Sequence, residues 1–488
     1  MKKTLTIILL LLSVRSLAQK AVFWYDPVEV ADKTYGNLHP RVALDQNYNP
    51  LVLWGDPNGK AFIAKWAGKE FAEPAQINPA NKHVFTEHWA GPEMVSRGDT
   101  IYVVYKELPE ETRHIFIKHS YNGGQNFSIE TQVDDSVDYI TRFPTVAIDP
   151  YGNPLVAFMK LDQNYNYPRY VVAKSKDLGE SFAGETTVTD VSGGVVSDCC
   201  PATVAESGNA TIILYRDNLN GLRNIWAGIS HNSGISFEKG IQVDQTNWMT
   251  KTCPANAPHG IIVSDTLYTV YTSGARDSSL IYLSKTSVTG LSATSVPVTG
   301  KFTGLTGQNF PRIANSGNAA AMVWQQAVSG ATQVCMLFTN EITTGFPAAY
   351  DTIATGVFEN TDVAIGGGHI YVVWEDDSAG KVMCRIGRYE ETITNKLLAE
   401  NTTIALKPSP NGKYFTVALR DITGCLMVDK NGIEYEPDIK CSKNLCTIYT
   451  GELDPGLYVV RLFCKDDKTY TYKYEVKEVK EKEEKEKK

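Results

Sequence analysis

The 488-residue sequence lacks features that would point to several large classes of function. Its 55 acidic residues outnumber 47 lysines and arginines and give a net charge of −8, whereas a nucleic-acid-binding protein needs a basic stripe. After the N-terminus no apolar run reaches about 18 residues, so no transmembrane helix is expected. Only eight histidines are present, which leaves few options for a metal, and we predict neither a metal site nor a cofactor. No helix follows Gly366–Gly368, so this run is a strand turn and not a phosphate loop.

The N-terminus has the order of a secretory signal peptide, predicted over residues 1–18. Lys2 and Lys3 precede the apolar core Ile7–Leu12, and Ser16-Leu17-Ala18 is a small-residue cleavage site. No cysteine directly follows that site, which argues against a lipid anchor. We therefore expect a secreted or cell-surface protein, whose nine cysteines predict several disulfides and at least one unpaired thiol.

One eight-residue motif occurs three times, in steps of 55 residues. The copies are Ser120–Phe127, Ser175–Phe182 and Ser230–Phe237, with the pattern S-x-[DN]-x-G-x-x-F. An Asp or Asn followed by Gly favours a tight turn, and the closing Phe is expected to pack between neighbouring sheets. A fixed repeat of about 40–50 residues or slightly more, built from short strands, is typical of propeller blades.

A second repeated sequence pattern, called the phrase below, occurs seven times. In each copy a strand begins, a turn follows, and a second strand ends in an aromatic residue. Its openings are Pro40, Pro92, Pro144, Pro201, Pro258, Pro311 and Asp362. The seventh phrase ends near Tyr389 without an outer strand, which Ala21–Val30 is expected to supply, closing the ring. We predict an all-β, seven-bladed propeller over residues 19–396, with six blades and an accessory hairpin as the alternative.

The C-terminal part differs in pattern and predicts a small β-sandwich over residues 397–476. Alternating apolar residues lie between Asn-Gly and Pro-Gly turns. The order P-x-P-N-G, D-x-x-G, L-x-P-G-x-Y-x-x-R and a Tyr/Lys strand resembles the C-terminal sorting domain of type IX secretion cargo. That resemblance implies the type IX secretion machinery as a partner and export across the outer membrane. Residues 477–488 are an additional Lys/Glu run, expected to be a solvated tail.

The eight-residue motif resembles the Asp-box, or BNR repeat, of sialidases and related propellers. In that family the motif holds a turn at the blade periphery, so its residues are expected to be structural. The resemblance implies a glycan or glycoprotein as the partner. The arginine phrase F-R-I-P of sialidases is missing, and the nearest text is His39-Pro40-Arg41-Val42.

The repeat places charged residues at the channel mouth, where inner strands begin and the loops after second strands project. The candidate ligand-binding residues there are Arg142, Arg216, Arg276, His39, His88 and Asp376. Sialidases hold the substrate carboxylate with three arginines, and Arg142, Arg216 and Arg276 fall in consecutive blades. The alternative is that Asp217 and Asp277 pair with the arginines that precede them.

Catalytic candidates follow from the same placement. Glu107, Asp217 and Glu375 lie at predicted mouth loops, where burial could bring a carboxyl pKa into a useful range. Sialidases use a tyrosine nucleophile, which adds Tyr271.

Three cysteines open the inner strands of blades 4 and 5: Cys199, Cys200 and Cys253. A Cys200–Cys253 bridge would leave Cys199 free, a vicinal Cys199–Cys200 bridge is a second possibility, and thiolates with His39, His88 or His259 could hold a soft metal. Export favours a bridge. The C-C-P and W-x-x-x-x-C-P elements resemble a group of uncharacterised sialidase-like secreted propellers.

Two functional hypotheses remain open from the sequence. The first is a secreted or cell-surface sialidase-like propeller that recognises glycans and hydrolyses terminal acidic sugars as an exo-sialidase. The second is a non-catalytic propeller that binds a glycan or a protein at the same mouth.

Overall fold

The computed structural model describes residues 22–390 and 406–476, apart from gaps at 136–137, 190, 193, 209, 238, 277, 290–292, 299–304, 410–412, 420–421, 430–433, 443–444, 452 and 465–468. The regular elements in these residues are strands, apart from the 3-10 helices η1 (Lys33–Tyr35) and η2 (Ile342–Thr344). The predicted all-β class is therefore confirmed. The expected signal peptide and charged tail lie outside the described residues. No described helix has the length and apolar character needed to cross a membrane.

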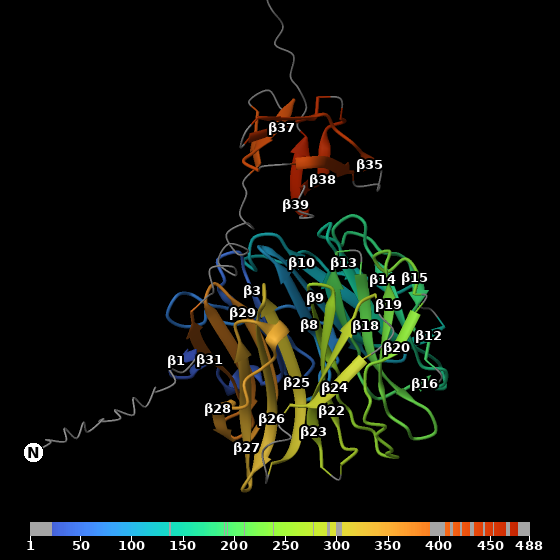
Figure 1. The fold of residues 1–488 in the computed structure, drawn as a ribbon, viewed down its shortest axis with the longest axis vertical. Coiled ribbons are helices and arrows are strands. Elements are labelled where there is room, and N and C mark those ends of the chain that lie inside the picture. The colour runs from blue at the N-terminus through green and yellow to red at the C-terminus, as the bar shows by residue number, and fades with distance from the viewer. Residues whose placement is uncertain are drawn as a thin grey trace, which may run out of the picture.

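Residues 22–389 form seven antiparallel sheets (Figure 1). We number them as blades in chain order. Blade 1 contains β3 (Leu38–Leu44), β4 (Pro50–Gly55), β5 (Ala61–Lys65) and β6 (Ala75–Gln76). Blade 2 contains β7 (His83–Val84), β8 (Glu93–Arg97), β9 (Thr100–Leu108), β10 (Ile115–Ser120) and β11 (Thr131–Gln132). Blade 3 contains β12 (Tyr139–Ile148), β13 (Pro154–Asp162), β14 (Arg169–Lys174) and β15 (Ala183–Thr187).

The remaining four sheets continue the series. Blade 4 contains β16 (Val195–Val196), β17 (Thr203–Ser207), β18 (Ala210–Asn218), β19 (Ile225–Ser230) and β20 (Lys239–Gln242). Blade 5 contains β21 (His259–Val263), β22 (Thr266–Ser273), β23 (Leu280–Ser287) and β24 (Ala293–Pro297). Blade 6 contains β25 (Thr306–Ser316), β26 (Ala319–Val328), β27 (Ala331–Thr339) and β28 (Asp351–Gly356). Blade 7 contains β29 (Phe358–Gly366), β30 (His369–Asp376), β31 (Lys381–Tyr389), β1 (Val22–Trp24) and β2 (Val28–Ala31).

The sheets close into a ring. The inner strands β3, β8, β12, β17, β21, β25 and β29 each contact the next, and β29 contacts β3. The N-terminal strand β1 pairs with β31, with Val22 opposite Tyr389. The prediction that the N-terminal segment supplies the outer strand of the last sheet is therefore confirmed, and the ring leaves no open edge at that point.

The aromatic residue predicted to end each second strand lies inside that strand and packs between neighbouring sheets. All seven of these side chains are buried, namely Trp54, Tyr105, Phe158, Tyr215, Tyr271, Trp324 and Trp374. The period-2 alternation of a strand does not separate a solvent face from a core face here, because both faces of a blade pack against neighbours. The repeated phrase therefore reflects the packing of each blade against its neighbours.

The three motif turns share one hydrogen-bond pattern. In each copy the serine Oγ accepts from the glycine N four residues on, at 2.9, 2.8 and 2.9 Å. The Asn or Asp Oδ1 accepts from the backbone N four residues on, at 3.1, 2.9 and 3.0 Å. The closing Phe127, Phe182 and Phe237 each pack against a core cluster. These residues have the structural role that the sequence predicts.

The C-terminal residues form two four-stranded sheets. One contains β32 (Leu406–Pro408), β33 (Tyr414–Val417), β37 (Leu445–Tyr449) and β36 (Ile439–Ser442). The other contains β35 (Glu434–Tyr435), β34 (Ile422–Val428), β38 (Gly456–Cys464) and β39 (Thr469–Val476). Phe415, Met427, Ile448 and Val460 are fully buried in their shared core. A disulfide joins Cys441 to Cys446 across the β36–β37 pair.

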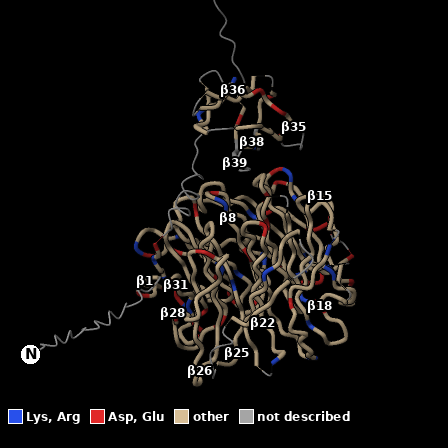
Figure 2. Tube along the Cα trace, in the orientation of Figure 1, with Lys and Arg blue, Asp and Glu red and all other residues tan. Residues whose placement is uncertain are grey.

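Charges of both signs are interspersed along the trace of the described residues, as Figure 2 shows. This part of the chain presents no continuous basic stripe of the kind that a phosphate backbone would require.

Candidate functional site

Four inner strands carry a bulge near the start of the strand, where it enters the channel mouth. The register with the second strand slips at this point in β3, β12, β25 and β29. A residue in each bulge has a positive φ although none is glycine: 56° at His39, 53° at Phe143, 49° at Phe310 and 39° at Asn360. Such backbone costs of the order of 1–3 kcal/mol per residue and is found preferentially at functional sites.

A ring of polar side chains lies just beyond the bulges. In the register of each blade, the member on the inner strand lies opposite the second-strand residue that precedes the buried aromatic residue. The members are Arg41, Glu93, Thr145, Thr203, His259, Arg312 and Asp362. Two cations face two carboxylates, so the ring is balanced in charge. A cavity of about 1820 Å³ extends from the ring along the rest of the inner strands, and residues of the C-terminal sheets such as Arg461 also line it.

Glu93 is the centre of the hydrogen bonds in this ring. Its Oε1 accepts from Arg41 Nε at 2.9 Å and from Arg312 Nη2 at 2.8 Å, and it lies 3.1 Å from His39 Nε2. Burial acts to raise the pKa of Glu93, but the guanidinium groups of Arg312 and Arg41 outweigh it and hold the pKa well below its usual range. Burial, reinforced by Arg41, lowers the pKa of His39 to about 4, so this imidazole is neutral at neutral pH.

Two of the residues predicted at the mouth, His39 and His88, meet at a third, Glu375, which is the penultimate residue of β30 and is fully buried. Glu375 Oε1 accepts from His39 N at 2.5 Å and from Asn360 Nδ2 at 3.0 Å. Its Oε2 lies 2.7 Å from His88 Nδ1. Glu359, the residue opposite Glu375 in the β29–β30 pair, brings Oε2 to 3.5 Å from the same nitrogen. The structure thus brings His39, His88 and Glu375 together at the end of the channel where the inner strands begin.

The electrostatics of this cluster favour a charged His88. Its hydrogen bond with Glu375 raises the pKa of His88 to about 9, while burial raises the pKa of Glu375. The side chains of His88 and Glu359 are each 44% exposed, and His88 Nε2 has no hydrogen-bond partner among the described residues. An imidazolium N–H and a carboxylate are thus both available at the mouth for acid–base chemistry.

The same three groups are also the arrangement most like a metal site in the described part of the propeller. One nitrogen and two oxygens of His88, Glu359 and Glu375 lie within 4.8 Å of one another, a ligand set that suits a divalent transition metal. The 2.7 Å contact between His88 Nδ1 and Glu375 Oε2 has the length of a charge-assisted hydrogen bond. In this structure His88 and Glu375 therefore share a proton.

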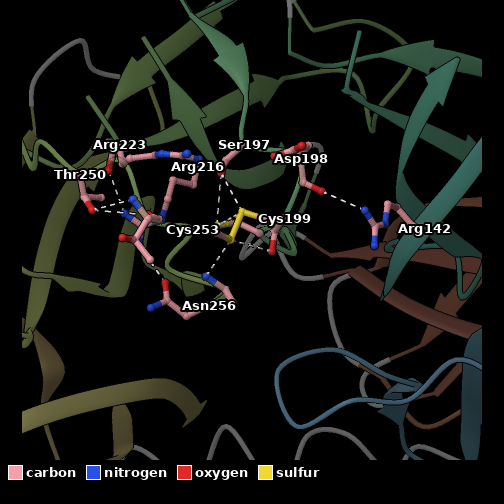
Figure 3. Close-up of a disulfide and its surroundings, with 12 residues drawn as sticks. Arg142, Ser197, Asp198, Cys199, Arg216, Arg223, Thr250, Cys253 and Asn256 are labelled. Atoms are coloured by element: carbon pink, nitrogen blue, oxygen red, sulfur yellow. Dashed lines mark hydrogen bonds between the residues drawn. A yellow bond between two sulfur atoms is a disulfide. The ribbon is translucent and has the colours of Figure 1, made fainter. Parts of the chain in front are cut away.

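The disulfide at the mouth joins Cys199 to Cys253 and links blades 4 and 5 (Figure 3). An interblade bridge was expected, but with the wrong partner, because Cys199 lies in the turn before the strand while Cys200 is buried as a free thiol. The Cys200 Sγ lies 4.0 Å from Cys199 Sγ and 3.5 Å from Ser197 Oγ. The vicinal bridge is also wrong, and a soft-metal site is not available while Cys199 and Cys253 are oxidised.

The three arginines do not form one carboxylate clamp. Arg216 is fully buried, and its guanidinium donates to Arg223 O at 2.8 Å and to Asn256 Oδ1 and Thr272 O at 2.9 Å each. Arg142 donates to Glu110 Oε1 at 2.9 Å, and Figure 3 shows it and Arg216 on either side of the disulfide. Arg276 is exposed.

Of the alternative ion pairs, only the one between Arg216 and Asp217 lies within the described residues. No ion pair joins Arg216 to Asp217 in the described residues, and Asp277 lies outside them. Burial raises the pKa of Asp217 to about 6, and its Oδ1 accepts from Asn224 N at 3.2 Å. Asp217 is thus held within blade 4.

The other catalytic candidates have structural environments. Tyr271 is the blade 5 member of the buried aromatic set, and its hydroxyl donates to Ser295 Oγ at 3.0 Å. Glu107 is buried, with Lys82 Nζ at 3.5 Å. Asp376 caps a turn, since its Oδ1 accepts from Ser378 Oγ at 2.6 Å. Sequence reasoning missed Glu359, whose place opposite Glu375 depends on the bulge.

No protein-family model and no curated protein matches the chain. Among solved structures, an ulvan lyase of polysaccharide lyase family PL25, bound to -[GlcA(1-4)Rha3S]-, has 11% identity and a TM-score of 0.51 over 76% of this chain and 99% of that chain. A protein of unknown function from Dyadobacter fermentans has 13% identity and a TM-score of 0.46, covering 76% and 100% of the two chains. The phage phi92 endosialidase has 10% identity and a TM-score of 0.44, covering 86% and 75%. At these identities the likeness shows the fold, a β-propeller.

Proposed function

We propose that this propeller recognises a glycan at the channel mouth and cleaves it by acid–base chemistry at His88 and Glu359. The observation that carries the proposal is the His88 imidazolium, held by the buried Glu375 on Nδ1 and open to the mouth on Nε2. The shared fold with a glycan-bound polysaccharide lyase supports a glycan as the ligand. Fold alone does not define a reaction, so the chemistry rests on this cluster.

The cluster supports a balanced proton cycle. The His88 Nε2–H donates its proton to the glycosidic oxygen as the C–O bond breaks. The Glu359 carboxylate takes a proton, either from the sugar carbon next to an acidic group, which leaves a double bond, or from a water that adds to the sugar. His88 Nδ1 keeps the proton that it shares with Glu375, so the cycle closes when Glu359 releases its proton to solvent and His88 Nε2 takes one up from solvent.

The short spacing favours elimination over hydrolysis with inversion, which needs acid and base groups about 6.5–9.5 Å apart. Hydrolysis of a terminal acidic sugar, the exo-sialidase hypothesis, lacks support from its usual residues because Arg216 and Tyr271 are buried. Non-catalytic glycan binding at the mouth is the second candidate. It is favoured if the pair of His88 and Glu375 serves only to join blades 2 and 7.

The test uses the full mature chain on soluble polysaccharides and a fluorogenic sialoside. New reducing ends report either reaction, and ultraviolet absorbance of an unsaturated sugar reports elimination alone. We expect cleavage that falls at least about 100-fold in His88→Gln, the usual effect of losing a general acid. The matched control is His83→Gln, a histidine of the same blade outside the cluster. Binding without cleavage would leave the non-catalytic candidate, and neither binding nor cleavage would overturn the proposal.

We also propose that the chain is exported, with residues 397–476 acting as the sorting domain. The Cys199–Cys253 and Cys441–Cys446 disulfides support this proposal, because such bridges persist in oxidising compartments. Removal of residues 397–488 should retain the propeller inside the cell, which fractionation followed by immunodetection measures. Equal amounts of full and shortened chain outside the cell would contradict the sorting role.

A further inference from the structure

The pentapeptide Asp-Gln-Asn-Tyr-Asn occurs twice, at residues 45–49 and 162–166. Both copies form the same turn. In each, the aspartate Oδ1 accepts from the backbone N two and four residues on, at 2.9 and 2.8 Å in the first copy and 2.9 and 2.7 Å in the second. The tyrosine has left-handed backbone in both copies, with φ of 60° at Tyr48 and 61° at Tyr165.

The two copies lie at opposite ends of the propeller and use the tyrosine differently. The first joins β3 to β4, away from the mouth, and Tyr48 packs so closely on blade 7 that a Cβ added to Gly366 would lie 2.5 Å from its ring. The second joins β13 to β14 at the mouth, and Tyr165 is 41% exposed. The same strained turn therefore positions one tyrosine for packing and presents the other to solvent.

Two more tyrosines extend this exposed surface. Tyr167 is 74% exposed and also has left-handed backbone, with φ of 55°. Tyr139, 40% exposed, pairs with Asp162 at the base of the loop. We call Tyr139, Tyr165 and Tyr167 the tyrosine platform. Left-handed backbone is uncommon for bulky residues, and no packing contact explains it at Tyr167 in the described residues.

Charges of both signs surround the platform, because Glu111 accepts from the Tyr165 hydroxyl and two cations lie beside Tyr139. The Tyr139 ring has Lys160 Nζ and Arg169 Cζ each 4.9 Å from its centroid. Lys160 is paired with Glu185, whereas Arg169 has no carboxylate within ion-pair distance among the described residues. An uncompensated guanidinium beside an aromatic face favours an anionic group on the ligand, since its planar fork pairs with two oxygens.

The platform is connected to the acid–base cluster by a chain of contacts. Trp89, next to His88, lies 5.1 Å from Phe143 between ring centroids, and Arg142 lies 4.3 Å over Phe143. Arg142 pairs with Glu110, and the neighbouring Glu111 accepts a hydrogen bond from the Tyr165 hydroxyl at 2.6 Å. Packed side chains of blades 2 and 3 therefore link the platform to the acid–base cluster.

We infer that the tyrosine platform is a binding subsite for the sugar rings of an anionic glycan, with Arg169 on a carboxylate or sulfate. The inference rests on the proposed function, because it places the cleaved bond at His88 and the neighbouring rings on the tyrosines. Tyrosine offers a large, rigid surface at a low cost in side-chain entropy, and its hydroxyl can bond sugar hydroxyls. The chain of the glycan would run along blades 2 and 3.

The test measures retardation of the full mature chain in gels that contain one of three polymers. Polygalacturonate carries carboxylates, carrageenan carries sulfates, and arabinan is neutral. We expect retardation by an anionic polymer, weakened roughly 2- to 10-fold for each of Tyr165→Ala and Tyr167→Ala, the range for one aromatic contact. Arg169→Gln should reduce binding of the anionic polymers only, and Arg169→Lys should restore part of it. The response to the two anionic polymers separates a carboxylate ligand from a sulfate ligand.

Tyr48→Ala is the matched control, because it removes the same residue from the same turn at the other end. It should lower the melting temperature and leave retardation of the folded protein unchanged. Unchanged retardation of the Tyr165→Ala, Tyr167→Ala double variant overturns the subsite, even if His88→Gln abolishes cleavage. Weakened retardation with undiminished cleavage by His88→Gln would keep the subsite and overturn the acid–base assignment. Absence of retardation by all three polymers overturns the subsite, and absence of cleavage as well overturns the proposed function too.

Discussion

Two histidines touch the same carboxylate and are nevertheless held in opposite protonation states. The backbone N–H of His39 donates to Glu375, and the His39 imidazole lies among the buried polar side chains around Glu93. Burial there lowers the pKa of this imidazole to about 4. His88 places its ring on Glu375 from the exposed side, and that hydrogen bond raises the pKa to about 9. The His39 imidazole is buried beside the Arg41 guanidinium, whereas the His88 imidazole is half-exposed beside carboxylates, so burial and the neighbouring charges together decide the charge of each ring.

The buried environment of His39 depends most on Glu93. Glu93→Ala leaves the guanidinium groups of Arg41 and Arg312 buried without their common acceptor. We expect a loss of about 3–5 kcal/mol in the free energy of unfolding, measured by denaturant titration. Glu359→Gln, which alters a half-exposed carboxylate, should change this free energy by less than about 0.5 kcal/mol. Similar values for the two variants would contradict the assigned network.

The histidines should separate in an NMR titration. His39 should show no protonation above about pH 5, whereas His88 should titrate near pH 9. Because the folded pKa of His88 lies above its unfolded value of about 6.5, its stabilising contribution is complete below pH 6.5 and is lost as the pH rises through 9. The difference in melting temperature between wild type and His88→Gln should therefore shrink from pH 7 to pH 10. A constant difference would argue against a charged His88.

The carboxylates around His88 should contribute unequally to its pKa. Glu375→Gln removes the buried partner and should return the pKa of His88 toward about 6.5. Glu359→Gln removes a half-exposed partner at 3.5 Å and should lower this pKa by less than about one unit. The same NMR titration measures both. Equal shifts would show that Glu359 and Glu375 hold the imidazolium together.

The sequence predicts the sheets well because their signals are local. A buried aromatic residue recurs in every repeat and the motif turn in three of them, and each repeat folds as one antiparallel sheet. The position of each residue within its repeat was enough to place His39, His88 and Glu375 at one end of the channel. The pattern could not decide which side of a strand Arg216 and Tyr271 face, because both faces of a blade are buried.

The errors at the site arise from local irregularity. The bridge uses Cys199 and not Cys200 because a turn precedes the strand, and one residue decides which side chain reaches blade 5. Glu359 opposes Glu375 only after a register slip in β29. Bulges and turns of this kind depend on tertiary packing, which a strand period alone does not reveal.

The pairing of β1 with β31 sets an order of events for folding. Val22 meets Tyr389, so the last sheet is completed by the first residues of the described chain. Until residue 389 has been synthesised, the chain is an open series of sheets whose terminal edges are unpaired. Closing a contact over such a sequence distance is slow, and shortened chains would keep an edge able to pair with a second molecule. The ring therefore makes completeness of the chain a condition for its solubility.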